Sequence, residues 1–182
     1  MGLANLARLS PWDAKSGALN VVIETSKGSR NKLKFDPDFG LFVLSKVLPR
    51  GLTFPFDFGF VPSTVGDDGD PLDVLLLMDE PTPPGSLVPA RLIGMIEATQ
   101  TEDGETKRND RLIAVAEKCH EHQDIHSVKD LSENLLREIE HFFVSCHELD
   151  GKRFKPIDHH GPTRAEKLVR KGAKRYREKG AD

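Results

Sequence analysis

The sequence predicts an α+β fold, a small β-barrel with two helices beside it. Up to about residue 116 the chain contains many short segments that are apolar or alternate between apolar and polar residues, with turn residues every 8–12 positions or so. The hydrophobic period then changes to that of helices near residue 130. Because the predicted strands are consecutive and few, one barrel is favoured over a sandwich.

The strands are predicted from the first segment onward. Residues 1–18 are mixed in composition and are interpreted as an N-terminal arm, and residues 19–182 are expected to form a single domain, long enough for a full core. Strands are predicted at residues 19–25, 30–36, 41–48, 74–78, 87–99 and 111–116. Four alternating phenylalanines from Phe54 to Phe60 would share one face of an extended chain, mostly in the core.

Two helices are predicted after the strands. Asp130 and Glu133 fit a capping box, and apolar residues follow at helical spacing to Phe142. A second helix is predicted from Thr163, with many Lys and Arg residues on one face. That face is typical of a solvated basic helix, and a phosphate-binding or nucleic-acid-binding face is the alternative.

Composition limits the function classes. The chain has 182 residues and a net charge of −3, so no nucleic-acid partner is expected. The absence of a long apolar run and of a signal-peptide pattern predicts no membrane association and a cytoplasmic protein. Cys119 and Cys146 are too few for a disulfide framework and are expected to be reduced.

The chain is organised around an acidic turn, Asp68-Gly-Asp-Pro-Leu-Asp73, that leads into an apolar strand. Gly69 and Pro71 exclude a helix interior there. Several carboxylates at the start of a rigid strand suit a hard cation such as Mg²⁺, and a solvated acidic loop is the alternative. No Gly-x-Ser-x-Gly elbow and no phosphate-binding Gly-x-x-x-x-Gly-Lys loop occurs in the sequence.

The acidic turn and the preceding stretch from Phe54 to Thr64 together resemble the soluble, Mg²⁺-dependent inorganic pyrophosphatases, over residues 19–155 or so. This family has an aromatic-Pro-x-x-Tyr-Gly-Phe-Ile-Pro stretch before an Asp-x-Asp-Pro-x-Asp signature, and the signature matches in full. The resemblance implies a five-stranded OB-like barrel with two flanking helices. It also implies hydrolysis of pyrophosphate to two phosphates by a metal-activated water, with Mg²⁺ or Mn²⁺. A homo-oligomer is implied as well, usually a hexamer in bacterial members.

The resemblance also implies roles for individual residues. Asp70 falls on the position of the carboxylate that orients or deprotonates the attacking water. The implied metal ligands are Glu24, Asp68, Asp73 and Asp110. The implied substrate-binding residues are Lys32, Lys34, Lys46, Arg111 and His147.

Several positions depart from the family pattern. Lys34 replaces a glutamate, Lys46 an arginine, Phe58 a tyrosine, Asn109 an aspartate, Arg111 a lysine, and Cys146-His147 a Tyr-Lys pair. Asp110 lies one residue from the expected aspartate, and a second loop carboxylate is ambiguous among Glu102, Asp103 and Glu105. The lost carboxylates predict fewer metal ions than the family's full complement, with the Lys34 ammonium binding phosphate directly.

Three further interpretations stay open. One is a hydrolase of an organic diphosphate or polyphosphate. Another is a non-catalytic, pyrophosphatase-like protein for binding or assembly. The third concerns the Cys119-His-Glu-His122 run with His126, whose residue types suit Zn²⁺ but whose spacing matches no four-ligand zinc pattern, so that a polar loop is the alternative.

Overall fold

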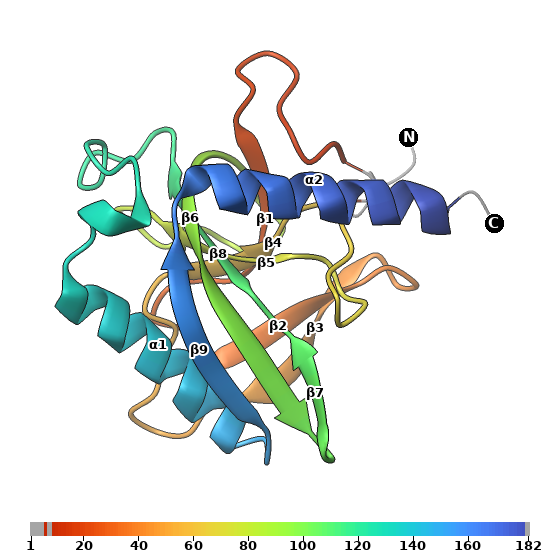
Figure 1. Ribbon diagram of the computed structural model, residues 1–182, viewed down its shortest axis with the longest axis vertical. Coiled ribbons are helices and arrows are strands. Elements are labelled where there is room, and N and C mark those ends of the chain that lie inside the picture. The colour runs from red at the N-terminus through yellow and green to blue at the C-terminus, as the bar shows by residue number, and fades with distance from the viewer. Residues whose placement is uncertain (1–5, 7–8, 181–182) are drawn as a thin grey trace.

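The computed structural model describes residue 6 and residues 9–180 of the chain, and these residues form an α+β fold, as predicted (Figure 1). The strands are β1 (Leu19–Thr25), β2 (Asn31–Asp36), β3 (Leu41–Val47), β4 (Asp57–Phe60), β5 (Asp73–Leu77), β6 (Leu87–Glu102), β7 (Glu105–Arg108), β8 (Arg111–Ala116) and β9 (Arg153–His160). The helices are α1 (Glu133–Glu148) and α2 (Pro162–Lys179), with a 3-10 turn at Val128–Asp130 before α1.

Five strands close into a ring. The order is β1-β4-β5-β8-β6, and the start of β6 pairs back with β1. The β5–β8 pair is parallel, and the other neighbours in the ring are antiparallel. This ring confirms the expected small, closed, five-stranded architecture. Gly59 permits the close approach of β4 to β1, because a Cβ atom there would lie 2.0 Å from the Val22 carbonyl oxygen.

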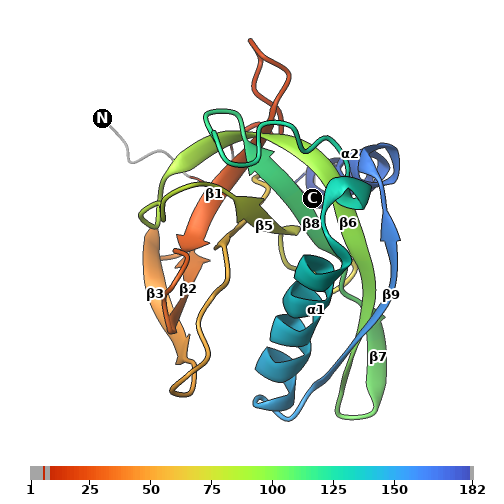
Figure 2. The ribbon, with the colours of Figure 1, turned by 90° about the vertical axis from the view of Figure 1, so that its left-hand side faces the viewer.

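Strand β6 connects the ring to the rest of the sheet. It is 16 residues long, and its second half extends beyond the ring to pair with β7 and β9. Helix α1 packs near β9. Helix α2 lies across β6 at the end that is away from β7 (Figure 1). The hairpin β2–β3 forms a separate two-stranded sheet. Figure 2 shows this hairpin on one side of the molecule and α1 with β7 on the other.

The aromatic stripe lies in the core, as predicted. Phe54, Phe56, Phe58 and Phe60 are all buried. The rings of Phe54 and Phe58 pack against Phe142 and Phe143 of α1, at centroid distances of 5.0 and 6.1 Å. Aromatic contacts of this kind add to the free energy gained from burial. They fix α1 against the wall of the ring, and so position the side chains that α1 directs toward the site.

Some boundaries differ from the sequence predictions. The N-cap of α1 is Ser132, and Asp130 instead completes a capping box with Ser127 around the preceding 3-10 turn. Helix α2 begins at Pro162 rather than Thr163. Strands β4, β7 and β9 were not among the predicted strands, because β4 and β7 are only four residues long and β9 contains a proline and few apolar residues.

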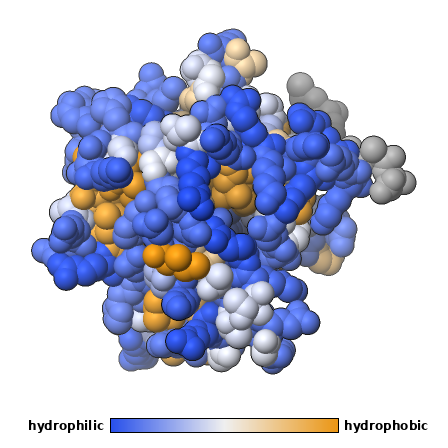
Figure 3. Space-filling view, viewed as in Figure 1, coloured by the Kyte–Doolittle hydropathy of each residue, from blue (hydrophilic) through white to orange (hydrophobic). Residues whose placement is uncertain are grey.

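Residues 1–5 and 7–8 of the predicted arm lie outside the described residues, and Trp12, further along, forms a β-bridge with Leu19. The arm and single-domain boundaries stay predictions. Hydrophilic side chains cover most of the face in Figure 3, with smaller apolar areas between them. No helix within the described residues is long and apolar enough to cross a membrane.

Candidate active site

The acidic turn is a compact loop held by its own backbone. The Gly66 N–H donates to the Asp70 carbonyl oxygen at 2.7 Å, and the Asp70 N–H donates to the Asp68 carboxylate at 3.1 Å. Gly69 adopts φ of +94°, a conformation that favours glycine. The chain then enters β5 at Asp73, one residue before the predicted start of the strand. The turn therefore carries Asp68, Asp70 and Asp73 into one region at the mouth of the ring.

These three aspartates line a cavity of about 690 Å³, a volume suited to a small ligand. It is bounded by the hairpin β2–β3, the acidic turn, α1 and the β6–β7 hairpin. The predicted site residues that line it are Lys32, Lys34, Lys46, Asp68, Asp70, Asp73, Arg111 and His147. Two predicted residues, Glu24 and Asp110, do not line it.

Glu24 lies in an adjoining cavity of about 320 Å³, which shares Lys32, Lys34, Asp70 and Asp73 with the larger one. Its carboxylate accepts a hydrogen bond from the Phe35 N–H at 2.8 Å and so holds the hairpin against β1. Burial, with the charge of Asp73, raises the pKa of Glu24 to about 7, although this hydrogen bond opposes the shift. Glu24 is thus next to the cavity rather than in its wall.

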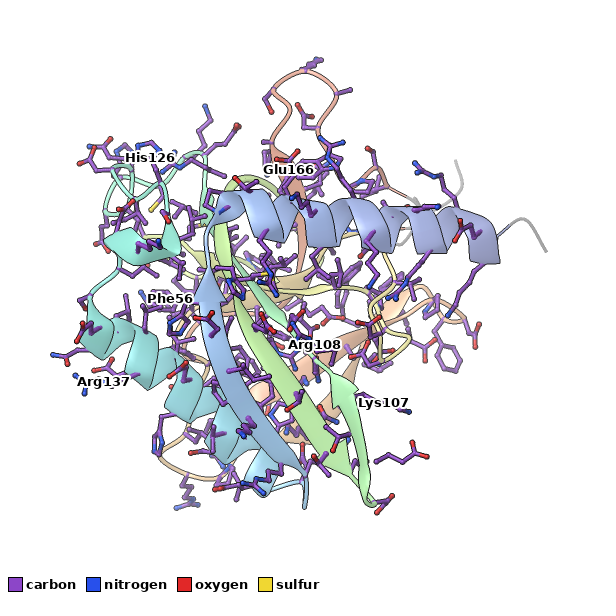
Figure 4. All side chains as sticks on the ribbon, in the orientation of Figure 1. Phe56, Lys107, Arg108, His126, Arg137 and Glu166 are labelled. Carbon is purple, nitrogen blue, oxygen red and sulfur yellow. The ribbon has the colours of Figure 1, made fainter. Side chains whose placement is uncertain are left out.

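Asp110 is engaged elsewhere. Its carboxylate accepts a hydrogen bond from the Ala98 N–H at 3.0 Å and pairs with Arg108 at 3.2 Å. Arg108 also pairs with Glu97 at 2.5 Å, and in Figure 4 it lies on the opposite side of β7 from Lys107. Asp110 also lines a small cavity of about 20 Å³ beside Asp68 and Asp73, so it lies next to the acidic turn, but its carboxylate is engaged in joining β8 to β6.

An amide pair lies beside the acidic turn, because Arg111 contacts both Asp73 and Asn109. The Asn109 side-chain NH₂ donates to the Gln100 Oε1 at 2.6 Å, and its oxygen accepts from Arg111. Sequence reasoning missed Gln100, although strand alternation places it on the same face of β6 as Glu102. Of the ambiguous loop carboxylates, Glu102, Asp103 and Glu105 all line the cavity at the hairpin tip. Glu102 pairs with Lys152 at 3.0 Å, and Glu105 with Lys107 at 3.4 Å.

Arg111 is the most enclosed cation of the site. Only 4% of its surface is exposed, and its guanidinium packs against the neighbouring rings of Phe143 and Phe154, at 5.3 and 5.4 Å from their centroids. It pairs with Asp73 at 2.7 Å. Its buried Nε has no hydrogen-bond partner among the described residues. A buried donor without a partner is costly, so a ligand oxygen would be bound favourably there.

The other cations differ in their partners. Lys46 donates to the Cys146 carbonyl oxygen at 3.2 Å and pairs with Asp150, which ties β3 to the end of α1. Lys34 pairs with Asp70 at 2.9 Å. The Lys32 ammonium lies 5.7 Å from the centre of the Phe58 ring, and burial lowers its pKa, against the charge of Asp73.

The carboxylates of the acidic turn also differ in their ion-pair partners. Asp70 and Asp73 each hold a cationic side chain, Lys34 and Arg111 respectively. Burial, with the charges of Asp73 and Asp70, raises the pKa of Asp68 above its ordinary value. Among the described residues no ion pair engages Asp68, so its charge is not compensated by a cation in direct contact.

His147 lines the cavity as a neutral side chain. Its Nδ1 lies 2.7 Å from the Phe143 carbonyl oxygen, which requires a proton on Nδ1, and its ring stacks on Phe154. Burial and the charge of Arg111 lower the pKa of His147 to about 4. The imidazole is thus available to a ligand as a hydrogen-bond acceptor through Nε2, and not as a cation.

The low pKa of His147 predicts a pH-dependent stability. Between pH 6.5 and about 4 the unfolded chain binds a proton at this position that the folded chain does not. The free energy of unfolding should therefore fall as the pH falls through this range, by at most about 3 kcal/mol. Urea unfolding at about pH 7.5 and about pH 4.5 measures the loss. His147→Gln should remove this contribution, whereas His141→Gln, at an exposed position of α1, should not. Identical pH dependence in the wild type and His147→Gln would contradict a neutral His147.

The Cys/His run after β8 forms a hydrogen-bonded loop. Asp79 accepts from the Cys119 thiol at 2.9 Å and from the backbone N–H groups of His120 and Glu121 at 2.9 Å each. These contacts lower the pKa of Asp79 to about 2. Within the described part of the chain, no group of three or more His, Cys, Asp or Glu side chains is arranged to hold a metal ion. The contacts favour the polar-loop interpretation over a zinc site.

Comparison with known proteins decides the family. The family model described as inorganic pyrophosphatase matches residues 21–177. The chain belongs to the inorganic pyrophosphatase family. It is 40% identical over 148 residues to the inorganic pyrophosphatase of Synechocystis, covering 81% of this chain and 85% of that one. It is 36% identical over 173 residues to the Nostoc protein of the same name, covering 95% and 99%.

Solved inorganic pyrophosphatase structures share the fold. The Thermus thermophilus enzyme superimposes with a TM-score of 0.86 at 33% identity, over 96% of this chain and 99% of that one. The Neisseria gonorrhoeae enzyme superimposes with a TM-score of 0.82 at 29% identity, over 93% and 96%. The family resemblance drawn from the acidic turn and its aromatic flank is confirmed, together with the fold class. The roles of individual site residues stay predictions for this member of the inorganic pyrophosphatase family.

Proposed function

We propose that this chain hydrolyses inorganic pyrophosphate to two phosphates. The observation that carries the proposal is that one cavity collects the three aspartates of the acidic turn together with Lys32, Lys34, Lys46 and Arg111. Phosphoryl transfer requires this combination of carboxylates and phosphate-binding cations. The names of the relatives favour pyrophosphate over an organic diphosphate, and favour catalysis over a purely binding role.

The carboxylates fit Mg²⁺, with Mn²⁺ as the alternative ion. They present oxygen ligands only. Although no three of the described carboxylates are arranged as a ligand set by themselves, Mg²⁺ in phosphate sites is commonly held by one or two carboxylates, phosphate oxygens and water. Asp68 has no ion-pair partner in the described part of the chain, and the charges of Asp70 and Asp73 act on it, so a divalent cation would compensate negative charge there. We therefore assign Asp68 and Asp73 as ligands, with Glu24 in support from the adjoining cavity. When bound, Mg²⁺ would neutralise phosphate charge and acidify a water.

The chain's own residues supply the remaining steps. Asp70 accepts a proton from the water that attacks one phosphorus, and it can do so at Oδ1 while Oδ2 keeps its contact with Lys34. The bond from that phosphorus to the bridging oxygen breaks, and the second phosphate leaves with the bonding electrons. Lys32, Lys46 and Arg111 bind the phosphate oxygens, where charge develops. His147 accepts a hydrogen bond from a protonated phosphate oxygen.

A phosphate-release assay tests the proposal. Purified chain is incubated with pyrophosphate and Mg²⁺ or Mn²⁺, and in parallel with tripolyphosphate and nucleoside di- and triphosphates. Release from pyrophosphate that stops on chelation, and exceeds release from the other substrates, is expected. If phosphate is released mainly from an organic substrate, that compound would replace pyrophosphate as the proposed substrate. No release from any of them, although pyrophosphate binds, would favour a non-catalytic role.

Asp68→Asn is expected to raise the Mg²⁺ concentration needed for half-maximal activity by on the order of tenfold, because it removes one ligand charge with little change in volume. A Mg²⁺ titration of the hydrolysis rate measures the shift. Asp38→Asn, in the exposed turn between β2 and β3, is the matched control and should titrate like the wild type. An unchanged titration for Asp68→Asn would remove Asp68 from the proposed metal site.

We also propose a cytoplasmic homo-oligomer, with the hexamer implied by the family as the first expectation. Large apolar side chains of the β2–β3 hairpin support self-association, since Phe39, Leu41 and Leu44 are more than half exposed. Cys119 and Cys146 are free and buried, which fits a reducing compartment. Sedimentation velocity tests the assembly, and a single monomeric species at micromolar concentration would contradict it.

A further inference from the structure

We propose that Lys34 takes the place of a metal ion beside Asp70, so that it neutralises and positions this carboxylate and reduces the number of Mg²⁺ ions that the site can bind. The inference rests on the proposed function, since it concerns the same cavity. It begins from one contact, the 2.9 Å pair between the Lys34 ammonium and the Asp70 Oδ2.

The contact joins two parts of the molecule that share no strand pairing. Lys34 belongs to the hairpin β2–β3, which is a sheet separate from the ring, and Asp70 belongs to the turn that enters β5. Both residues line the larger cavity and the adjoining one, so the pair lies where the two cavities meet. Half of each side chain is exposed, 50% for Lys34 and 59% for Asp70, which leaves the ammonium accessible to a ligand.

The position of the ammonium is unfavourable for a nearby divalent cation. The charges of Glu24 and Asp73, as well as that of Asp70, act on Lys34. A fixed positive charge among these carboxylates repels a second cation and compensates part of the negative charge that would attract one. No ion pair between residues that the structure describes engages Asp68, so its carboxylate stays available for one ion, with Asp73, which it would share with Arg111, as a second ligand.

The β6–β7 side of the cavity replaces little of this attraction for a second cation. Gln100 and Asn109 are uncharged amides bonded to each other, and the Asn109 oxygen is already engaged by Arg111. An amide pair offers a cation no net charge. The carboxylates of Glu102 and Glu105 at the hairpin tip are paired with Lys152 and Lys107. We therefore expect the Lys34 ammonium to bind phosphate directly, in the role that a metal ion would otherwise have beside Asp70.

The first experiment counts Mg²⁺ ions by isothermal titration calorimetry of the full chain without substrate. Lys34→Glu should bind one more Mg²⁺ per chain than the wild type. Lys34→Gln adds no ligand, and should bind Mg²⁺ more tightly by on the order of tenfold, because a repulsive charge is removed. Lys174→Glu is the matched control, since Lys174 also pairs with an acidic residue at the surface, Glu178 of α2, and its variant should titrate as the wild type does.

The second experiment uses pyrophosphate binding in the presence of a chelator. The wild type should bind pyrophosphate without metal, and Lys34→Gln should bind it more weakly by on the order of tenfold, because one charge-assisted hydrogen bond is lost. Lys34→Gln is close in shape to the wild type at a half-exposed position, so it carries the test even where Lys34→Glu fails to fold.

The outcomes separate the two proposals. Unchanged Mg²⁺ binding in both variants overturns the role of Lys34, whether or not pyrophosphate is hydrolysed. The expected Mg²⁺ shifts in a chain that releases no phosphate uphold Lys34 and overturn the proposed hydrolysis. Unchanged metal-free pyrophosphate binding in Lys34→Gln overturns the direct phosphate contact.

Discussion

Asp70→Asn is expected to lower kcat for pyrophosphate hydrolysis by about 10²–10⁴-fold, because an amide cannot take the proton of the attacking water. The change leaves the side-chain volume almost unaltered, and the Asp70 backbone N–H, which caps the turn through Asp68, is retained. Steady-state rates at saturating pyrophosphate and Mg²⁺ measure the effect. The thermal unfolding midpoint should stay close to that of the wild type, because the Lys34–Asp70 pair is half exposed and contributes little to stability.

The matched control for Asp70→Asn is Asp67→Asn in the same loop. Asp67 pairs with Arg175 of α2 and does not line the larger cavity. Its variant loses the same charge a few residues away and should keep near-normal kcat. Near-normal turnover in Asp70→Asn would remove Asp70 from the role of proton acceptor. An equal loss in both variants would show that the charge of the loop matters rather than the position of Asp70.

Arg111→Met is expected to lower kcat/KM for pyrophosphate by about 10²–10³-fold, since it removes a preorganised donor facing the phosphate. Methionine keeps the packing against Phe143 and Phe154, so the structural losses are the pair with Asp73 and the hydrogen bond to Asn109. Breaking this mostly buried pair should also lower the free energy of unfolding by roughly 3 kcal/mol. Kinetics and urea unfolding on the same preparation measure both losses.

Arg91→Met separates the two losses. Arg91 is a structural arginine whose guanidinium donates to the backbone carbonyl oxygens of Gln123 and Ile125 at 2.8 and 2.9 Å, away from the larger cavity. Its replacement should destabilise the chain and leave kcat/KM close to the wild-type value. If Arg91→Met lowers kcat/KM as much as Arg111→Met does, the effect at Arg111 would be one of folding rather than of phosphate binding.

The parts of the site that the sequence predicts depend on residues close together in the chain. The conformation of the Asp68–Asp73 segment is determined within the segment, because its glycine, its proline and its internal hydrogen bonds all lie within one turn. The strand that follows is an uninterrupted apolar run, and such a run is buried wherever it pairs. The family pattern could therefore be recognised from this segment, and the three aspartates meet in one cavity as expected.

The partners of the site residues were not predictable from spacing. Lys46 meets Asp150, which is 104 residues away, and Asp110 is occupied by the backbone of β6. Alternation along a strand fixes which face a side chain takes, but the register between strands decides what it meets there. The neutral state of His147 likewise depends on burial beside Arg111, and these two positions are far apart in the sequence.

The paired cations of the cavity make ligand binding an exchange of counter-ions. Lys34, Lys46 and Arg111 each hold an aspartate before any phosphate arrives. An incoming anion must displace or share these aspartates, so the attraction between the anion and the cations is weaker than it would be in their absence. Added salt weakens the internal pairs as well as the phosphate contacts. Affinity for a highly charged substrate should consequently vary less with ionic strength than in a pocket of unpaired cations, and discrimination should favour anions compact enough to meet several released cations at once.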